Sequence, residues 1–280
     1  MRSMIGLVTD SNSQITRELA DRFQVEVVPL TVTIDGVEFL EGVDLDADGL
    51  YAHFSAGRTP SITTSQPSPG RFAEAYRRLA EVGCSEIVSI HISEAMSGTI
   101  GSATLAARDA LVPVHIIDTG SASFGVSVCV WTAGVAIERG AGVEHIRQLV
   151  ATVAPLIGTV FMIGIPLLTE RGGRAAGPDF VVDGDGIPVL SMRAGALELL
   201  ERVTTIEDAV DVMSTYAAGW GDRMTVAIGT ADDWRLSARL ESALSGLSNI
   251  DAVTHYRVGP TVGAHTGPGT FGLFVFPTPS

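Results

Sequence analysis

The last part of the chain, Val258–Phe276, combines one histidine, several hydroxyl groups and a dense set of glycines. His265 and Thr266 could contact a small polar ligand, because glycine has no Cβ and lets the backbone approach such a group closely. Three of these glycines match the letters of a dinucleotide-binding fingerprint, which needs a helix directly after it. Only eight residues follow the last of them, Gly272, and they are typical of a strand and a tail. The stretch therefore predicts a loop that holds a small polar group other than a nucleotide.

Serine and threonine residues stand at the ends of several predicted strands. In open parallel sheets such ends meet at one edge, where ligands bind. Helix N-termini at this edge would add free N–H groups and a partial positive charge, which suits an anionic head group. Each hydroxyl could instead only cap a helix, and that alternative stays open. The candidate ligand-binding residues, with the two from the C-terminal stretch, are Thr63, Thr64, Ser97, Ser123, His265 and Thr266.

The sequence lacks the common signatures of catalysis and metal binding. All 18 basic residues are arginine, which excludes a P-loop lysine and a Schiff-base lysine. No G-x-S-x-G, H-E-x-x-H, C-x-x-C or Walker A sequence occurs. Asp44 opens a stretch similar to an EF-hand loop, but Ser55 stands where that loop needs its closing glutamate. We therefore expect no catalytic residue, no metal ion and no cofactor.

Two enzymatic alternatives stay open. Ser97 and His265 could form the nucleophile and base of a hydrolase or acyltransferase that acts on a lipid ester, although spacing alone cannot show this. The hydroxyl-rich strand ends are also compatible with a phosphate-binding enzyme. His91 lies inside an apolar strand, so we expect a packed histidine there rather than a base.

Composition bounds the class of protein. Apolar residues make up 46% of the 280 residues, charged residues make up 18%, and the net charge is −14. An acidic chain is a poor partner for nucleic acid and for anionic membrane surfaces. Cys84 and Cys129 stand alone in apolar contexts, which predicts buried free thiols in a reducing compartment. Because no signal-peptide pattern opens the sequence, we expect a cytoplasmic protein.

One uncharged segment, Val150–Leu168, is long enough to be weighed as a membrane span. Pro155 and Pro166 interrupt it, and prolines disfavour a continuous helix. We expect instead the end of a helix followed by a buried strand, and therefore no stable membrane insertion.

Strand and helix signals alternate along the chain, which predicts an α/β fold. In the first half, strands separated by helices of this length pair in parallel through right-handed crossovers. The second half is predicted to continue as helix, strand, helix and strand. The predicted strands are 4–10, 25–34, 86–92, 114–118, 224–229 and 252–258, and the predicted helices are 69–82, 97–110, 121–139, 142–154, 204–218 and 232–244.

Seven stretches, in a fixed order, resemble the DegV family of bacterial fatty-acid-binding proteins. They run from residue 8 to residue 275 and so cover nearly the whole chain. Each could occur by chance, but the ordered set is specific. The stretches are Val8–Ser11, Val27–Thr31, Thr64–Gly70, Ile90–Ser93 with Ser97–Thr99, Val114–Asp118 with Ser121–Ser123, Arg171–Arg174, and Gly259–Gly269.

The resemblance implies a two-domain DegV-type (EDD-like) fold that binds a long-chain fatty acid in an internal tunnel. A parallel-sheet domain over 1–158 would carry the head-group contacts, and a second α/β domain over 159–280 would complete the tunnel. The family's threonine in T-S-Q-P-S and serine in S-G-T contact the carboxyl group, and they correspond to Thr64 and Ser97 here. His265 is expected beside that group. The resemblance implies a lipid-binding protein that is not itself an enzyme.

The resemblance also implies a protein partner. Such proteins act as acyl carriers for a separate fatty-acid kinase, and Arg171 and Arg174 would contribute to docking. A family stretch rich in arginine and lysine corresponds here to Thr204–Asp208, which is neutral to acidic. We therefore expect lipid binding to persist and the kinase contact to differ or be lost.

Overall fold

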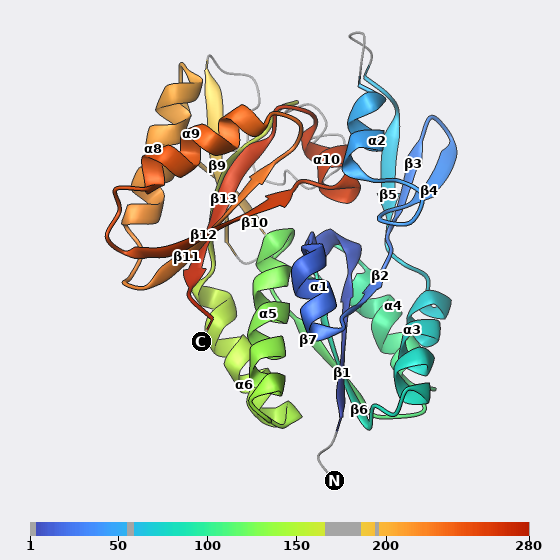
Figure 1. Ribbon diagram of the computed structural model, residues 1–280. Helices are drawn as coiled ribbons and strands as arrows, with labels where there is room; N and C mark the ends of the chain where they lie inside the picture. The colour runs from blue at the N-terminus through green and yellow to red at the C-terminus, as the bar shows by residue number, and fades with distance from the viewer. Residues whose placement is uncertain (1–3, 55–58, 166–185, 194–195, 280) are drawn as a thin grey trace.

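The structure is a computed structural model that describes residues 4–54, 59–165, 186–193 and 196–279. Within these residues the strands form sheets of four, six and three strands. In Figure 1 the four-stranded sheet and its helices fill the lower half, and the six-stranded sheet lies above them. The predicted α/β fold class, with a parallel sheet and a second sheet domain, is confirmed.

The four-stranded sheet is entirely parallel, as the alternation of strands and helices predicts. Its strand order is β2-β1-β6-β7. Successive side chains of a strand point to opposite faces, so Leu7 packs in the core beneath α5 and α6 while Val8 packs beneath α3 and α4. The strands are β1 (Ile5–Asp10), β2 (Glu26–Val28), β6 (Glu86–His91) and β7 (Val114–Asp118).

Helices cover both faces of this sheet. Ser68 caps α3 and Pro69 is its first residue, as the sequence predicts. Helix α5 is apolar on all sides because it lies between the parallel sheet and the six-stranded sheet. The elements are η1 (Ser11–Ser13), α1 (Arg17–Phe23), α3 (Pro69–Glu81), α4 (Thr99–Ala107), α5 (Phe124–Glu138), α6 (Val143–Val153) and η3 (Ala154–Leu156).

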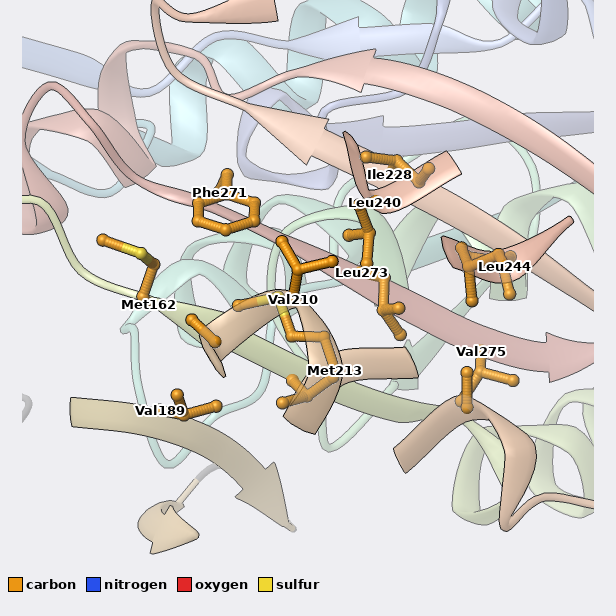
Figure 2. Close-up of a cluster of buried hydrophobic side chains, with 14 of the residues drawn as sticks. Met162, Val189, Val210, Met213, Ile228, Leu240, Leu244, Phe271, Leu273 and Val275 are labelled. Atoms are coloured by element: carbon orange, nitrogen blue, oxygen red, sulfur yellow. The ribbon is translucent and has the colours of Figure 1, made fainter. Parts of the chain in front are cut away.

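The six-stranded sheet is mixed, with order β10-β9-β8-β13-β11-β12. Among the described residues of this sheet, β11 and β12 pair in parallel and the other neighbouring strands pair antiparallel. Helices α8 and α9 cover one face of this sheet. Met213, Leu240 and Phe271 belong to the core that the helices and the sheet enclose (Figure 2). The elements are β8 (Gly158–Met162), β9 (Ile187–Arg193), β10 (Ala196–Val203), α8 (Ile206–Ala218), β11 (Met224–Thr230), α9 (Trp234–Leu244), β12 (Ile250–Arg257) and β13 (Phe271–Pro277).

A small antiparallel sheet corrects the prediction of one strand over 25–34. Pro29 and Leu30 separate β2 from β3, and the two strands belong to different sheets because proline has no N–H for a continuous ladder. The small sheet packs against α2 and α10. Its elements are β3 (Thr31–Ile34), β4 (Val37–Leu40) and β5 (Ile62–Ser65), with α2 (Ala47–Ala52).

The prediction of a loop across the glycine-rich C-terminal stretch was partly wrong. Pro260–Thr266 forms the short helix α10, with proline at its first position. Gly267 ends the helix with φ +77°, a backbone conformation that suits glycine. The stretch therefore places His265 in the last turn of a helix.

The uncharged segment contains the end of α6, then η3 and the buried strand β8, as expected. Among the described residues, no helix combines the length and the apolar composition that crossing a bilayer requires. Cys84 and Cys129 are buried free thiols, as predicted, and burial raises the pKa of Cys129 to about 12. The chain enters the six-stranded sheet at β8, and the division into 1–158 and 159–280 stays a prediction.

Candidate functional site

A mostly apolar cavity lies where the three sheets meet. It is bounded by the carboxyl ends of β1, β6 and β7, the inner face of the six-stranded sheet, β5 and α10. The volume open to the centre of a water molecule is about 130 Å³, room for roughly ten waters. Packed interiors seldom leave voids larger than one water, so this space is suited to a ligand. Its apolar wall includes Leu30, Ile92, Met96, Phe161, Ile163, Met192, Leu197, Val258, Val262, Phe271, Leu273 and Phe274.

Two glycines shape the sheet side of this wall. A Cβ on Gly229 would lie 2.2 Å from the ring of Tyr256, and one on Gly272 would lie 2.4 Å from the Cβ of Phe161. Both distances are too short for real atoms, so a side chain at either glycine would displace Tyr256 or Phe161. Tyr256 also stacks on Phe124, with ring centroids 4.7 Å apart. The aromatic lining therefore depends on two positions without side chains.

The polar groups of the described cavity lining are hydroxyls, one amide and the imidazole of His265. None of the described lining residues is aspartate, glutamate or arginine. Burial raises the pKa of Tyr256 to about 12, an effect that the Ser123 hydroxyl partly offsets, so the phenol stays neutral near pH 7. The polar lining residues are Asn12, Thr64, Ser97, Ser123, Thr159, Tyr256, Thr261, His265, Thr266 and Thr270.

Thr64 and His265 meet although 201 residues separate them in sequence. Thr64 Oγ1 lies 2.8 Å from His265 Nε2, which joins β5 to the last turn of α10. The neighbouring Thr63 lies on the opposite face of β5, is exposed, and is not part of the cavity lining. The period of two in a strand thus separates two candidates that look equivalent in the sequence.

Ser97 lines the cavity from the turn before α4. Its Oγ lies 2.8 Å from Thr99 Oγ1 and accepts a bond from the Thr99 N–H at 3.3 Å. A Cβ on Gly98 would lie 2.9 Å from the side chain of Gln66, so the turn packs directly against the segment that follows Thr64. Close packing of the two motifs brings both hydroxyls to one cavity.

Ser123 and Thr266 line the same cavity but differ in the hydrogen bonds of their hydroxyl groups. Thr266 donates its hydroxyl to the Val262 carbonyl at 3.1 Å, inside α10. Ser123 immediately precedes α5 and has φ +53° and ψ −142°, a conformation that costs a residue with a side chain about 1–3 kcal/mol. Its Oγ is buried and makes no well-formed hydrogen bond within the described residues.

Glu41 fixes the N-terminal end of α10. Its carboxylate accepts bonds from the Thr261 N–H at 2.9 Å and the Thr261 hydroxyl at 2.7 Å. Ser11 Oγ donates to it at 2.5 Å and Gln14 Nε2 at 3.3 Å. Burial raises the pKa of Glu41, and these hydrogen bonds partly oppose that rise. The network ties η1 and the end of β4 to the helix that carries His265.

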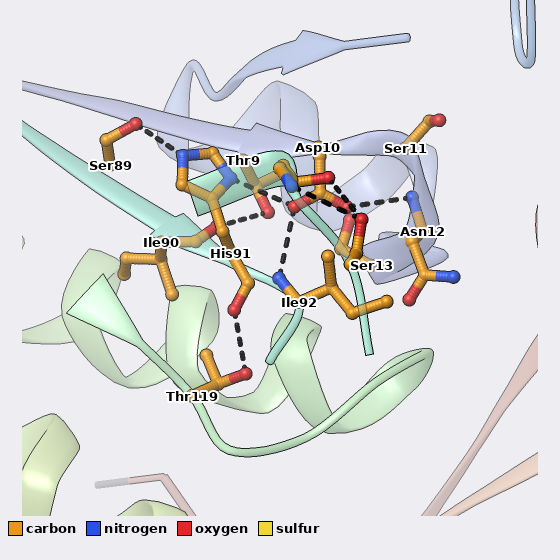
Figure 3. A network of polar contacts seen from close by, with 12 residues as sticks. Thr9, Asp10, Ser11, Asn12, Ser13, Ser89, Ile90, His91, Ile92 and Thr119 are labelled. Carbon is orange, nitrogen blue, oxygen red and sulfur yellow. Dashed lines mark hydrogen bonds and ion pairs between the residues drawn. The ribbon is translucent and has the colours of Figure 1, made fainter. Parts of the chain in front are cut away.

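A second polar network, drawn in Figure 3, lies in the parallel sheet outside the cavity. His91 Nδ1 lies 2.9 Å from Asp10 Oδ2, and His91 Nε2 lies 2.6 Å from Ser89 Oγ. The Tyr76 hydroxyl lies 3.0 Å from the same Ser89 oxygen. This order of groups is similar to a Ser-His-Asp triad. Ser89 and His91 have no exposed surface, however, so the network is structural, in keeping with the expected packed histidine.

From the sequence we also named candidate docking residues, weighed a metal site and left a nucleophile pair open. Arg171 and Arg174 lie outside the described residues. No group of histidine, cysteine or acidic side chains in the described parts of the chain is arranged to hold a metal ion. In the proposed Ser97–His265 nucleophile pair, His265 Nε2 contacts Thr64 and Ser97 contacts Thr99.

Sequence reasoning missed five polar residues of the cavity lining: Asn12, Thr159, Tyr256, Thr261 and Thr270. Asn12 stands among the hydroxyl-bearing residues that follow β1, so its position after a strand was an available signal. Tyr256 lies near the end of β12 and carries no local pattern that marks a site. Its role depends on Gly229 of the neighbouring strand, which only the fold reveals.

Comparisons with known proteins give the family. The family model described as "Uncharacterised protein, DegV family" matches residues 4–278. A DegV domain-containing protein of Streptomyces coelicolor is 34% identical, over 98% of this chain and 99% of that protein. One from Deinococcus radiodurans is 32% identical, over 98% of each chain.

Solved structures agree with this result. A DegV family protein from Thermus thermophilus, whose structure is described as showing fatty acid binding, has a TM-score of 0.88. It is 29% identical, with 99% of this chain and 100% of that chain covered. A Bacillus subtilis DegV, described as a fatty acid binding protein, has a TM-score of 0.87 and shares the fold at 23% identity, over 98% and 99% of the two chains. The chain described here belongs to the DegV family.

Proposed function

We propose that this protein binds a long-chain fatty acid in the cavity between the sheets and holds its carboxyl group with Thr64, Ser97 and His265. The observation that carries the proposal is a cavity of about 130 Å³ with a mostly apolar wall and a hydroxyl–imidazole pair 2.8 Å apart on it. The fatty acid binding described for the Thermus thermophilus relative supports it.

The acyl chain supplies most of the affinity. Each buried CH₂ group contributes about 0.8 kcal/mol, so a chain with the length of palmitate offers roughly 11 kcal/mol before the costs of ordering. Met96 and Met192 lie on the wall, and their flexible side chains suit the accommodation of such a chain. Chain burial is insensitive to the identity of the head group, so selection for an acid must come from the polar lining.

Neutral donors suit a carboxyl group in such a site. Because no charged arginine or lysine side chain lines the described cavity, burial favours the protonated acid, which both donates and accepts hydrogen bonds. Thr64 and Ser97 can donate and accept in turn. Thr266 lines the wall nearby, although its hydroxyl already bonds within α10.

We further propose that the protein is a carrier and not an enzyme. The Ser97 hydroxyl is paired with Thr99 rather than with a base, and no nucleophile elbow occurs in the sequence. The buried free thiols fit a reducing, cytoplasmic compartment. The carrier would present its fatty acid to a partner such as a fatty-acid kinase. Arg171 and Arg174 are the candidate residues for docking that partner.

The charge of the segment Thr204–Asp208 affects how such a partner could dock. Thr205 accepts a bond from the Asp208 N–H at 3.1 Å, and the Asp208 carboxylate accepts from the Thr205 N–H at 3.0 Å, which caps α8. Bonds from Thr205 and Thr204 lower the pKa of Asp208, so the segment is anionic at pH 7. A kinase that docks through basic residues of its carrier would lose attraction here.

The experiment is native mass spectrometry of the protein purified from bacteria, before and after delipidation. The proposal predicts a mass increment equal to one fatty acid, which delipidation removes and added hexadecanoic acid restores. Protein that carries no increment and takes up no acid would refute it. The loaded protein, offered to a bacterial fatty-acid kinase with ATP, then tests the carrier role through acyl-phosphate formation.

A further inference from the structure

The N-terminus of α5 is open toward the cavity. This helix has fifteen residues, eleven of them buried, and no side chain caps its first turn. The Ser123 N–H donates to Asn12 Oδ1 at 2.9 Å, and Val126 bonds back to the Ser123 carbonyl at 3.0 Å. Ala122 and Ser123, which precede the helix, line the cavity, so the positive end of the helix dipole lies beside the ligand space.

Two buried polar side chains flank this helix end and line the cavity. Ser123 is 8% exposed, and its Oγ has no hydrogen-bond partner among the described residues. The Tyr256 hydroxyl is close enough for Ser123 to influence its ionisation, but the two groups form no well-formed bond. Asn12 is 6% exposed, and Figure 3 shows its side chain directed away from Asp10.

The side-chain oxygen of Asn12 accepts a hydrogen bond, whereas its side-chain nitrogen donates none to the described residues. Because Oδ1 receives the Ser123 N–H, the amide nitrogen must be Nδ2, and it makes no hydrogen bond within the described parts of the chain. An alkyl chain cannot form hydrogen bonds with such groups, and a buried donor without a partner is unfavourable. Filling the cavity with a plain acyl chain would therefore leave hydrogen-bonding atoms of these two side chains unsatisfied.

We propose that Asn12 and Ser123, at the N-terminus of α5, form a second polar position in the cavity, which binds an oxygen carried by the acyl chain itself. The ligand class is then a hydroxylated long-chain fatty acid. A hydroxyl suits the position because it can accept from Asn12 Nδ2 and donate to Ser123 Oγ. The proposal rests on the proposed function, which assigns the carboxyl group to residues of other elements, namely β5, α10 and the turn before α4.

The backbone of Ser123 fits this assignment. Its φ of +53° is in the region that favours glycine, yet a serine occupies it. A glycine would relieve the strain but would remove the Oγ from the cavity wall. A strained side chain without an internal partner is expected at positions that contact a ligand.

The test is a displacement titration of the delipidated protein with hexadecanoic acid and a positional series of hydroxyhexadecanoic acids. For the unaltered protein, at least one hydroxy acid should bind about tenfold more tightly than hexadecanoic acid. Ser123→Ala should abolish that preference, which is measured as the ratio between the Kd of hexadecanoic acid and the Kd of the hydroxy acid for the same protein. Thr63→Ala, on the exposed face of β5, is the matched control and should keep the preference.

A crystal structure of the preferred complex gives a second readout that does not depend on the variant folding. The ligand hydroxyl should lie within hydrogen-bond distance of Ser123 Oγ or Asn12 Nδ2. An ordered water in that place, or a series in which no hydroxy acid exceeds hexadecanoic acid, would overturn the second position and leave fatty-acid binding intact. Failure of every acid to bind would instead overturn the proposed function as well.

Discussion

The substitution Thr64→Val isolates the polar end of the proposed site. Valine keeps the branched shape of threonine and replaces only the hydroxyl, which lies 2.8 Å from His265 Nε2. The apolar wall stays intact, so the loss is confined to the hydrogen bonds of one half-buried hydroxyl. Such a loss costs about 1–3 kcal/mol. The Kd for hexadecanoic acid should therefore rise about 5- to 150-fold.

Thr63→Val provides the matched control, because it makes the same chemical change one residue away on the exposed face of β5. Binding is measured for both variants by displacement of a fluorescent fatty acid, and stability by thermal unfolding. The Thr64 variant should bind more weakly while the Thr63 variant binds as the unaltered protein does. Equal Kd values for the two variants would refute the assignment of Thr64 to the head group.

Three further substitutions probe the framework of the site. Because burial raises the pKa of Glu41, the free energy of unfolding of the unaltered protein should fall as pH rises above about 4.3, the ordinary value for glutamate. Glu41→Gln should lack that fall in urea unfolding between pH 4 and 8, and parallel profiles would contradict this reasoning. Asp10→Ala leaves His91 without its buried partner and should lower the free energy of unfolding by about 3–5 kcal/mol; a loss below about 1 kcal/mol would exclude this role. Gly229→Ala should displace the ring of Tyr256, cost about 1–3 kcal/mol and weaken fatty-acid binding; unchanged binding and stability would show that the wall tolerates the methyl group.

The sequence predicts the parallel half of the fold well because its signals are local. Ser68 and Pro69 mark the start of α3, and apolar runs separated by helices require parallel pairing. It fails over 25–34 because the segment was interpreted as one strand, although Pro29 marks the break between β2 and β3. The small antiparallel sheet is missed for the same reason, although it positions Thr64.

The site is predicted in part, for reasons that particular residues make clear. Thr64, Ser97 and His265 stand in recognisable motifs, and the fold brings them to one cavity. Thr63 could be separated from Thr64 only once the pairing of β5 was known. Tyr256 reaches the cavity because a distant glycine makes room for it, and such long-range packing leaves no local trace in the sequence.

The most direct measurement is a crystal structure of the delipidated protein reloaded with hexadecanoic acid. The carboxyl group should lie within hydrogen-bond distance of Thr64 Oγ1 or Ser97 Oγ, with the chain against Phe161 and Phe274 of the six-stranded sheet. A second groove lies between α5, α6 and the C-terminal tail and is lined by Arg139 and His145. An acid bound there, with the central cavity closed by the protein's own side chains, would contradict the account.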